Sequence, residues 1–307
     1  MKKLIKFLFP SLVLLSGCVN LNTSSSNSQN SSSPLNNSSS IDVIETIITI
    51  DELDTIAKNI KEENSKPTFK IPSKITSKKT MQDKIFYNDE QEPSENYTYT
   101  TVMGIDSDLG YAYMTRDDNN EKSSAYAYVK DTTFIYTEDY QNNKQYQIKE
   151  FESKEMALQY FKNEFTYMTN FLDLITPDIQ GLESLKTLTS YIHTYKVCEE
   201  NGGLSAFETY ELNIEGSKTN ENSFKSHIDV YAIHENKLNT FLSDETYNFE
   251  FKNGIQTYCL TDSSIKTTRK QNNEIIITKS KTEIINTLDV NIIYPDLSSY
   301  KYVDSLF

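Results

Sequence analysis

The sequence has no tryptophan and few of the residues that build common catalytic and metal sites: 3 cysteines, 3 histidines and 8 glycines among 307 residues. His193, His227 and His234 are scattered, and no CxxC pair or HExxH segment accompanies them, so no zinc site is expected. GxSxG, Walker and dinucleotide glycine patterns are absent as well, which argues against a hydrolase. We therefore predict a protein that is not an enzyme and that holds no metal ion and no cofactor.

Positive charge is also scarce. The chain has 30 lysines and arginines against 44 acidic residues, a net charge of -14. Without Lys2, Lys3 and Lys6 the balance is 27 against 44, or -17. Such a surface repels nucleic acid and anionic headgroups, so we predict neither as a partner of the folded part.

One turn shares some features with a calcium-binding loop. Asp106-Ser107-Asp108-Leu109-Gly110 has alternating acidic residues, but its glycine comes one position early. Asp117 stands where the closing bidentate glutamate would fall. A solvated turn is therefore the preferred interpretation.

The N-terminal segment has the layout of an export signal. Lys2, Lys3 and Lys6 form a basic head, and the run from Leu4 to Leu15 is mostly apolar but too short to span a membrane. Leu15-Ser16-Gly17-Cys18 then resembles the lipobox of bacterial lipoproteins. The resemblance implies cleavage before Cys18 and lipidation of its sulfur, which would place the protein on the outer side of the cell membrane, anchored to the bilayer. An ordinary secretory signal with a chance cysteine is the alternative.

The residues after the lipobox predict a tether. Residues 19–40 are dominated by Ser and Asn and cannot form a core, so we expect them to be disordered. A flexible coil of that length spans about 25 Å root-mean-square. The predicted organisation is thus a signal peptide at 1–17, a lipidated cysteine and linker at 18–40, and one folded domain at 41–307.

The other two cysteines are Cys198 and Cys259. In an exported protein they could form a disulfide, which would stabilise the fold by about 4 kcal/mol through the unfolded state. Exported proteins of low-GC Gram-positive bacteria often avoid disulfides, so both the paired and the unpaired state stay open.

Helical periodicity appears twice in the predicted domain. Asp51 to Glu63 places Leu53, Ile56, Ala57 and Ile60 on one face. The second helix runs from a Ser153 cap to Ile175, with an aromatic face typical of a sheet-covering core. The stretch from Lys66 to Asp83 is basic and only weakly patterned.

A period of two dominates from Tyr97 onward. Tyrosines alternate with small or polar residues in short runs that polar turns separate, which predicts an antiparallel meander. A strand is expected at Tyr191 to Val197, paired through a Gly202-Gly203 turn with Tyr210 to Ile214. Further strands are predicted at Glu274 to Lys279 and Asp289 to Tyr294.

Asn253-Gly254 is the sharpest hairpin signal in the chain. A two-residue turn there pairs Phe251 with Gln256, Phe249 with Tyr258 and Tyr247 with Leu260. Cys259 would then lie opposite Asn248 on the more polar face.

Three stretches of short aromatic strands lead through a polar turn into a helix: Tyr126–Asp131, Thr133–Tyr136 and Asn143–Phe151. Together with the closing Ile293–Ser298, this layout over Pro67–Tyr302 resembles the lipoprotein-carrier superfamily typified by LolA and LppX, in its low-GC Gram-positive form. The resemblance implies an α+β fold, in which a curved antiparallel half-barrel has helices packed on one face. It also implies an apolar cavity for acyl chains or lipids.

Two functions follow from these expectations. The first is a non-catalytic lipoprotein that binds an apolar or lipid ligand beneath the second helix, with Phe161, Phe165, Met168 and Leu172 lining the site. The second is a surface lipoprotein that binds a protein partner or serves the envelope structurally. A lined cavity of roughly 300 Å³ or more between sheet and helix would favour the first. A filled core with an exposed aromatic patch would favour the second.

Overall fold

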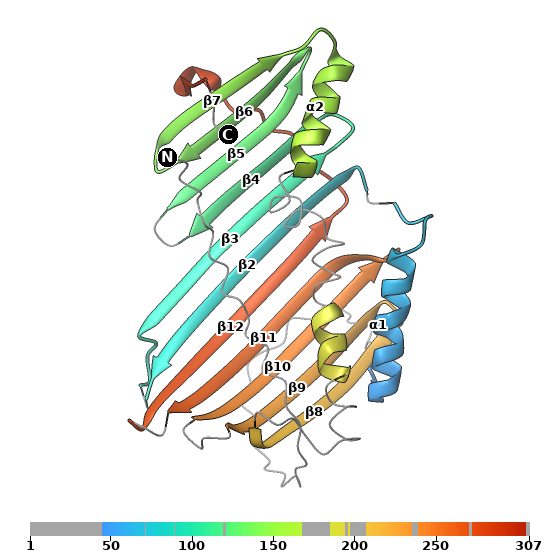
Figure 1. The fold of residues 1–307 in the computed structure, drawn as a ribbon, viewed down its shortest axis with the longest axis vertical. Coiled ribbons are helices and arrows are strands. Elements are labelled where there is room, and N and C mark those ends of the chain that lie inside the picture. The colour runs from blue at the N-terminus through green and yellow to red at the C-terminus, as the bar shows by residue number, and fades with distance from the viewer. Residues whose placement is uncertain are drawn as a thin grey trace, which may run out of the picture.

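A computed structural model of the chain describes residues 45–70, 72–88, 90–118, 121–167, 185–193, 196, 207–234, 239–269 and 272–304. Within them, one open 13-stranded sheet forms the body of the molecule (Figure 1). Its strand order is β1-β8-β9-β10-β11-β12-β2-β3-β4-β5-β6-β7-β13. All neighbours are antiparallel except β7 and β13, which are parallel.

The elements are these, in chain order within each class. The helices are α1 (Ile50–Asn64), α2 (Lys154–Tyr167), a further helical segment at 185–193 and the short 3-10 turn η1 (Leu297–Ser299). The strands are β1 (Thr46–Ile48), β2 (Lys74–Tyr87), β3 (Glu95–Asp106), β4 (Tyr111–Asp118), β5 (Lys122–Lys130), β6 (Thr133–Tyr140), β7 (Asn143–Glu150), β8 (Phe207–Asn220), β9 (Ser223–His234), β10 (Asn239–Lys252), β11 (Ile255–Arg269), β12 (Glu274–Thr287) and β13 (Lys301–Tyr302).

The register shows that α1, α2 and the helical segment at 185–193 share one face of the sheet. Ile284, which packs in the core beneath α1, lies beside Lys79, and the same row continues through Thr101 to Arg116. Arg116 and Ala112 are an even number of residues apart on β4, and Ala112 packs in the core beneath α2. We call this side the helix face and the other the outer face. The predicted α+β fold, with an antiparallel sheet and helices on one face, is confirmed (Figure 1).

Helix α1 forms where the periodicity predicts it. Thr49 caps its start: the Glu52 N–H donates to the Thr49 hydroxyl, and the Thr49 N–H donates to the Glu52 carboxylate at 2.8 Å. The buried stripe consists of Leu53, Ile56, Ala57 and Ile60. Burying each large side chain of this stripe contributes roughly 1.5–3 kcal/mol, so packing on β8 rather than propensity holds the helix.

Helix α2 begins as predicted, with the Met156 N–H donating to the Ser153 hydroxyl at 3.3 Å. Ala157 and Phe161 are buried against β5 and β6. The prediction is confirmed as far as Tyr167, and its continuation to Ile175 lies outside the described residues.

The C-terminal segment covers part of the outer face. Val290, Ile292 and Leu297 pack on a buried cluster of Tyr111 and Tyr128 there. The prediction of a strand at Asp289 to Tyr294 is wrong. These residues cross the outer face, and the backbone of Ile293 bonds to a tyrosine side chain instead of a strand.

The Asn253-Gly254 hairpin is confirmed, with φ of 52° and 77° at its two turn residues. Phe251 pairs with Gln256 as expected, but the register shifts at a bulge between Glu250 and Phe251. Phe249 therefore faces Cys259, and the predicted partners Tyr258 for Phe249 and Leu260 for Tyr247 are wrong. Because a one-residue shift reverses the side-chain direction, Cys259 is 2% exposed on the helix face rather than on a polar face.

Two other local predictions fail. Tyr191 lies in the helical segment at 185–193, not in a strand, because its apolar neighbours Leu185, Leu188 and Ile192 recur at helical spacing and are buried. The weakly patterned stretch after Lys66 contains the long strand β2. Residues 197–206, with Cys198 and the Gly202-Gly203 turn, lie outside the described part.

Candidate functional site

The core beneath α2 is filled where the structure describes it. Phe161 is 1% exposed and packs against Phe134, with ring centroids 6.5 Å apart, and against the small residues Ala112 and Ala127. The Phe165 side chain, Met168 and Leu172 lie outside the described residues. That these four residues line a lipid site therefore stays a prediction. Phe161, the one whose side chain is described, is too closely packed to have space for a ligand beside it.

A pocket of about 250 Å³ lies at the other end of the helix face, where α1 meets the turn after β8. Four of its six lining residues are charged, yet the surface that they present to the pocket is mostly apolar: Asp51, Glu52, Thr55, Ile56, Lys218 and Glu221. The pocket is open to solvent, so it is not the enclosed site that buries most of a bound ligand's surface.

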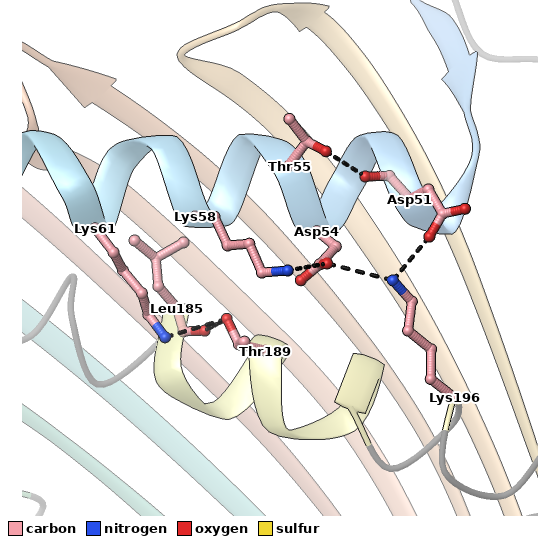
Figure 2. A network of polar contacts seen from close by, with 8 residues as sticks. All are labelled: Asp51, Asp54, Thr55, Lys58, Lys61, Leu185, Thr189 and Lys196. Atoms are coloured by element: carbon pink, nitrogen blue, oxygen red, sulfur yellow. Dashed lines mark hydrogen bonds and ion pairs between the residues drawn. The ribbon is translucent and has the colours of Figure 1, made fainter. Parts of the chain in front are cut away.

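Figure 2 shows how α1 is fastened to the helical segment at 185–193 and to Lys196. The Lys196 ammonium group lies 2.7 Å from Asp51 Oδ1 and 3.3 Å from Asp54 Oδ2. Lys58 approaches the same Asp54 oxygen at 2.7 Å. Burial raises the pKa of Asp54, but the hydrogen bonds from Lys58 and Lys196 outweigh it and leave that pKa lowered.

A buried carboxylate links the same helical segment to the sheet. Glu245 on β10 is 4% exposed and accepts three hydroxyl hydrogen bonds: from Ser243 at 2.6 Å, Tyr247 at 2.7 Å and Tyr191 at 3.1 Å. Burial, with the nearby Glu245 charge, raises the pKa of both tyrosines above their usual range, so they remain donors. Because three hydroxyls donate to it and each of its oxygens has a partner, we interpret Glu245 as a structural connector.

In the turn that begins at Asp106, the Asp106 carboxylate accepts hydrogen bonds from the backbone of the turn itself. Asp106 Oδ1 accepts the N–H groups of Asp108 and Leu109 at 3.1 and 3.0 Å, and Oδ2 lies 3.2 Å from Lys74 Nζ. These contacts are those of an Asx-type turn.

His227 has two acidic neighbours. On the outer face its Nε2 lies 3.1 Å from Asp244 Oδ1 and 3.4 Å from Asp229 Oδ1. The three side chains are 41%, 65% and 49% exposed, and we interpret them as surface ion pairs.

The most distinctive surface lies on the helix face of β2 and β3. Met81, Ile85 and Tyr87 of β2 point to this side, as do Tyr97 and Tyr99 of β3. We call these five residues the tyrosine strip. They are half-buried except for Tyr97, which is 52% exposed. Beside them, the same face of β11 and β12 carries mainly small hydroxyl residues: Thr261, Ser263, Thr267, Thr278, Ser280 and Thr282.

Polar contacts hold the strip's rings in place. The hydroxyls of Tyr87 and Tyr97 both donate to the Glu95 carboxylate, the former at 3.2 Å. These bonds raise the pKa of both phenols. The Arg116 guanidinium lies 4.8 Å from the centre of the Tyr99 ring. The strip is thus an ordered aromatic surface that offers apolar area, hydroxyl groups and one stacked guanidinium.

Sequence reasoning located part of this surface. The alternation at Tyr97 and Tyr99 predicted that they share a face. Tyr87, Met81 and Ile85 were missed because β2 was not predicted. The available signal was the alternation of Ile75, Ser77, Lys79 and Met81 with Thr and Lys, which is a strand pattern despite its lysines.

No protein-family model matches the chain, and no curated protein matches its sequence. Among the residues that the structure describes, none of the helices has the length and apolar character needed to span a membrane.

Proposed function

We propose that the protein is a lipid-anchored, extracytoplasmic binding protein without catalytic activity, which engages a protein partner through the tyrosine strip. The single observation that carries this proposal is the ordered aromatic surface itself, on a sheet whose core beneath α2 is filled as far as the structure describes it. A filled core with exposed aromatic residues is the arrangement expected of a partner surface.

The composition of the strip supports a protein partner. Tyrosine and arginine are enriched at interface hot spots, because their large side chains bury much area at a small cost in conformational entropy. Tyr87 and Tyr97 are already restrained by Glu95, and Tyr99 by Arg116, so part of the ordering cost is met before binding. The surrounding Ser and Thr hydroxyls would supply adaptable hydrogen bonds.

The anchoring half of the proposal rests on the sequence. Cys18 follows a signal-like leader, and the predicted linker of residues 19–40 would span about 25 Å root-mean-square as a flexible coil. Such a tether lets the folded part reorient above a bilayer and search for a partner close to the membrane.

Binding of an apolar ligand remains the alternative proposal for the region around α2. It requires space near Met168 and Leu172. Mass spectrometry of lipid that co-purifies with the full chain separates it from the partner-binding proposal.

The experiment for partner binding is site-specific photo-crosslinking in intact cells. A photoreactive phenylalanine analogue replaces Tyr97 in the full chain, and Leu109, 46% exposed in a turn outside the strip, takes the same probe as a control. We expect a discrete covalent product with another protein at position 97 and not at position 109. Equal labelling at both positions, or no product at 97, would refute the proposal.

A further inference from the structure

The outer face carries a segregated charge pattern. Three acidic side chains, Glu215, Asp229 and Asp244, lie on β8, β9 and β10. Lysines predominate on the next strands along the sheet: Lys266 on β11, Lys279 and Lys281 on β12, and Lys84 on β2. Asp262 of β11, which is exposed opposite Lys281, is the acidic exception. In a chain with a net charge of -14, this basic group stands out from the rest of the sequence.

The pattern follows one cross-strand row in detail. From β8 to β3 the row reads Asn213, Asp229, Asp244, Ser264, Lys279, Lys84 and Asn96. Read in reverse, each acidic position becomes a lysine position, each lysine position becomes an acidic one, and the asparagines exchange. Ser264 is the centre of this antisymmetric row.

The next row is symmetric about Lys266: it has two apolar side chains on each side of this lysine. It reads Tyr231, Leu242, Lys266, Ile277 and Phe86 from β9 to β2. Reversal places Leu242 against Ile277 and Tyr231 against Phe86. Leu242 is 42% exposed, so it is an apolar side chain that a partner could cover.

We infer that the outer face is a self-association surface, on which a second copy of this chain stacks face to face about a two-fold axis parallel to β11. A two-fold interface is self-complementary: when residue i of one copy meets j of the other, j also meets i. The axis would lie between the two stacked sheets and pass Ser264. It brings Asp244 opposite the second copy's Lys279 and Asp229 opposite its Lys84, and the two-fold symmetry makes each of these pairs occur twice.

The geometry of stacked sheets suits these pairs. Packed sheets lie about 10 Å apart with nearly aligned strands, a distance that a lysine and an aspartate side chain bridge together. Five strands by four rows cover about 24 by 27 Å, so the two copies would bury roughly 1,300 Å² in total, within the range of specific interfaces.

The single chain also has unfavourable pairs that a second copy would relieve. Asp229 lies directly opposite Asp244, and Lys279 lies directly opposite Lys84. Like charges at directly opposed positions destabilise a sheet. His227 lies within 3.4 Å of both carboxylates and would offset part of their repulsion only when its ring is protonated. Lys266 and Asp262 of β11 would each meet their own copy at the axis. The long stem of Lys266 can turn along the strand, and the exposed Asp262 is the one acidic pair that the stacking leaves unrelieved.

Charge reversal in the full chain tests this inference. Asp244→Lys alone and Lys279→Asp alone each place like charges across the proposed axis, so each should reduce the dimer fraction at least about tenfold. A mixture of the two variants, carrying different tags, should restore it, because both mixed contacts are then Lys against Asp. Recovery on mixing also separates an intermolecular contact from an effect within one chain.

A second measurement places the axis. Ser264→Cys should form a covalent dimer with a short bis-maleimide, since the two cysteines would face each other. Ser263→Cys is the matched control, one residue away and on the helix face, and the wild-type chain shows the background from native cysteines. Equal cross-linking of Ser264→Cys and Ser263→Cys would overturn the inference. So would a failure of the charge-reversed pair to associate.

Discussion

Tyr111 and Ile293 hold each other through a reciprocal pair of hydrogen bonds. The Tyr111 hydroxyl donates to the Ile293 carbonyl at 2.7 Å and accepts from the Ile293 N–H at 3.0 Å. Tyr111 is 1% exposed, and its ring meets Tyr294 edge-on with centroids 5.5 Å apart. One side chain on β4 thus fastens the C-terminal segment to the outer face.

Replacing Tyr111 by Phe should remove both bonds and leave the Ile293 backbone groups without their partner. The expected loss is about 1–3 kcal/mol in the free energy of unfolding, with faster hydrogen exchange at the Ile293 amide. Denaturant unfolding and amide exchange measure the two effects. Tyr113→Phe is the control, because the ring of Tyr113 stacks on Tyr126 and that packing survives the change. An equal loss in both variants would show that the hydroxyl of Tyr111 has no special role.

Protonation of Asp54 at low pH should destabilise the region around α1. Its pKa is lowered from the ordinary 3.8 in the folded chain, so the folded state holds its proton less tightly than the unfolded state. This contribution is fully present above pH 3.8 and is lost as the pH falls through the folded pKa. Asp54→Asn should therefore cost about 1–2 kcal/mol at pH 7 and flatten the decline in stability below about pH 4.

The control for that measurement is Asp51→Asn, because Asp51 also pairs with Lys196 but is 80% exposed. Exposed pairs contribute roughly 0.2–1 kcal/mol, so its loss should be smaller. Thermal unfolding of both variants across the acidic range gives the comparison. If Asp54→Asn keeps the full acid sensitivity of the wild type, the network in Figure 2 is not its source.

Gly110 should not tolerate a side chain. Its φ is +66°, and a Cβ there would lie 2.5 Å from a Leu158 methyl carbon and 3.0 Å from one of Val129. Gly110→Ala combines an unfavourable backbone conformation with overlap against α2, so we expect a loss of about 2–4 kcal/mol. Thermal denaturation measures it. A loss below about 1 kcal/mol would mean that α2 shifts easily at this contact.

Cys18→Ala should abolish membrane anchoring without changing the stability of the folded part. Cys18 is the residue that the lipobox resemblance marks for lipidation, and a long linker separates it from β1. Fractionation of cells, combined with the mobility of the mature chain, provides the readout. Persistence in the membrane fraction by a route other than an uncleaved leader would contradict the lipobox interpretation.

Much of the fold was predictable because its signals are local. The capping pattern from Thr49 to Glu52 and the apolar spacing after it determine α1. The alternation of tyrosines with small residues in β3, β4 and β5 determines the meander, since only a period of two places those rings on a common face. Asn253-Gly254 marks a hairpin because both residues tolerate positive φ.

The remaining features depend on information outside any single segment. The bulge at Glu250 changes the register by one residue, and nothing local distinguishes the shifted pairing that buries Cys259. Tyr191 alternates as a strand would, yet tertiary packing over Glu245 makes it helical. The charge antisymmetry around Ser264 involves seven strands and becomes visible only when their register is known.

The most direct test of the central claim is a titration of the protein captured at position 97 against the full chain. Tyr97→Ala should weaken binding at least about tenfold, as expected for a hot-spot aromatic residue, while Leu109→Ala should leave the affinity unchanged. Unchanged affinity for Tyr97→Ala, in a variant whose unfolding midpoint equals that of the wild type, would contradict the account.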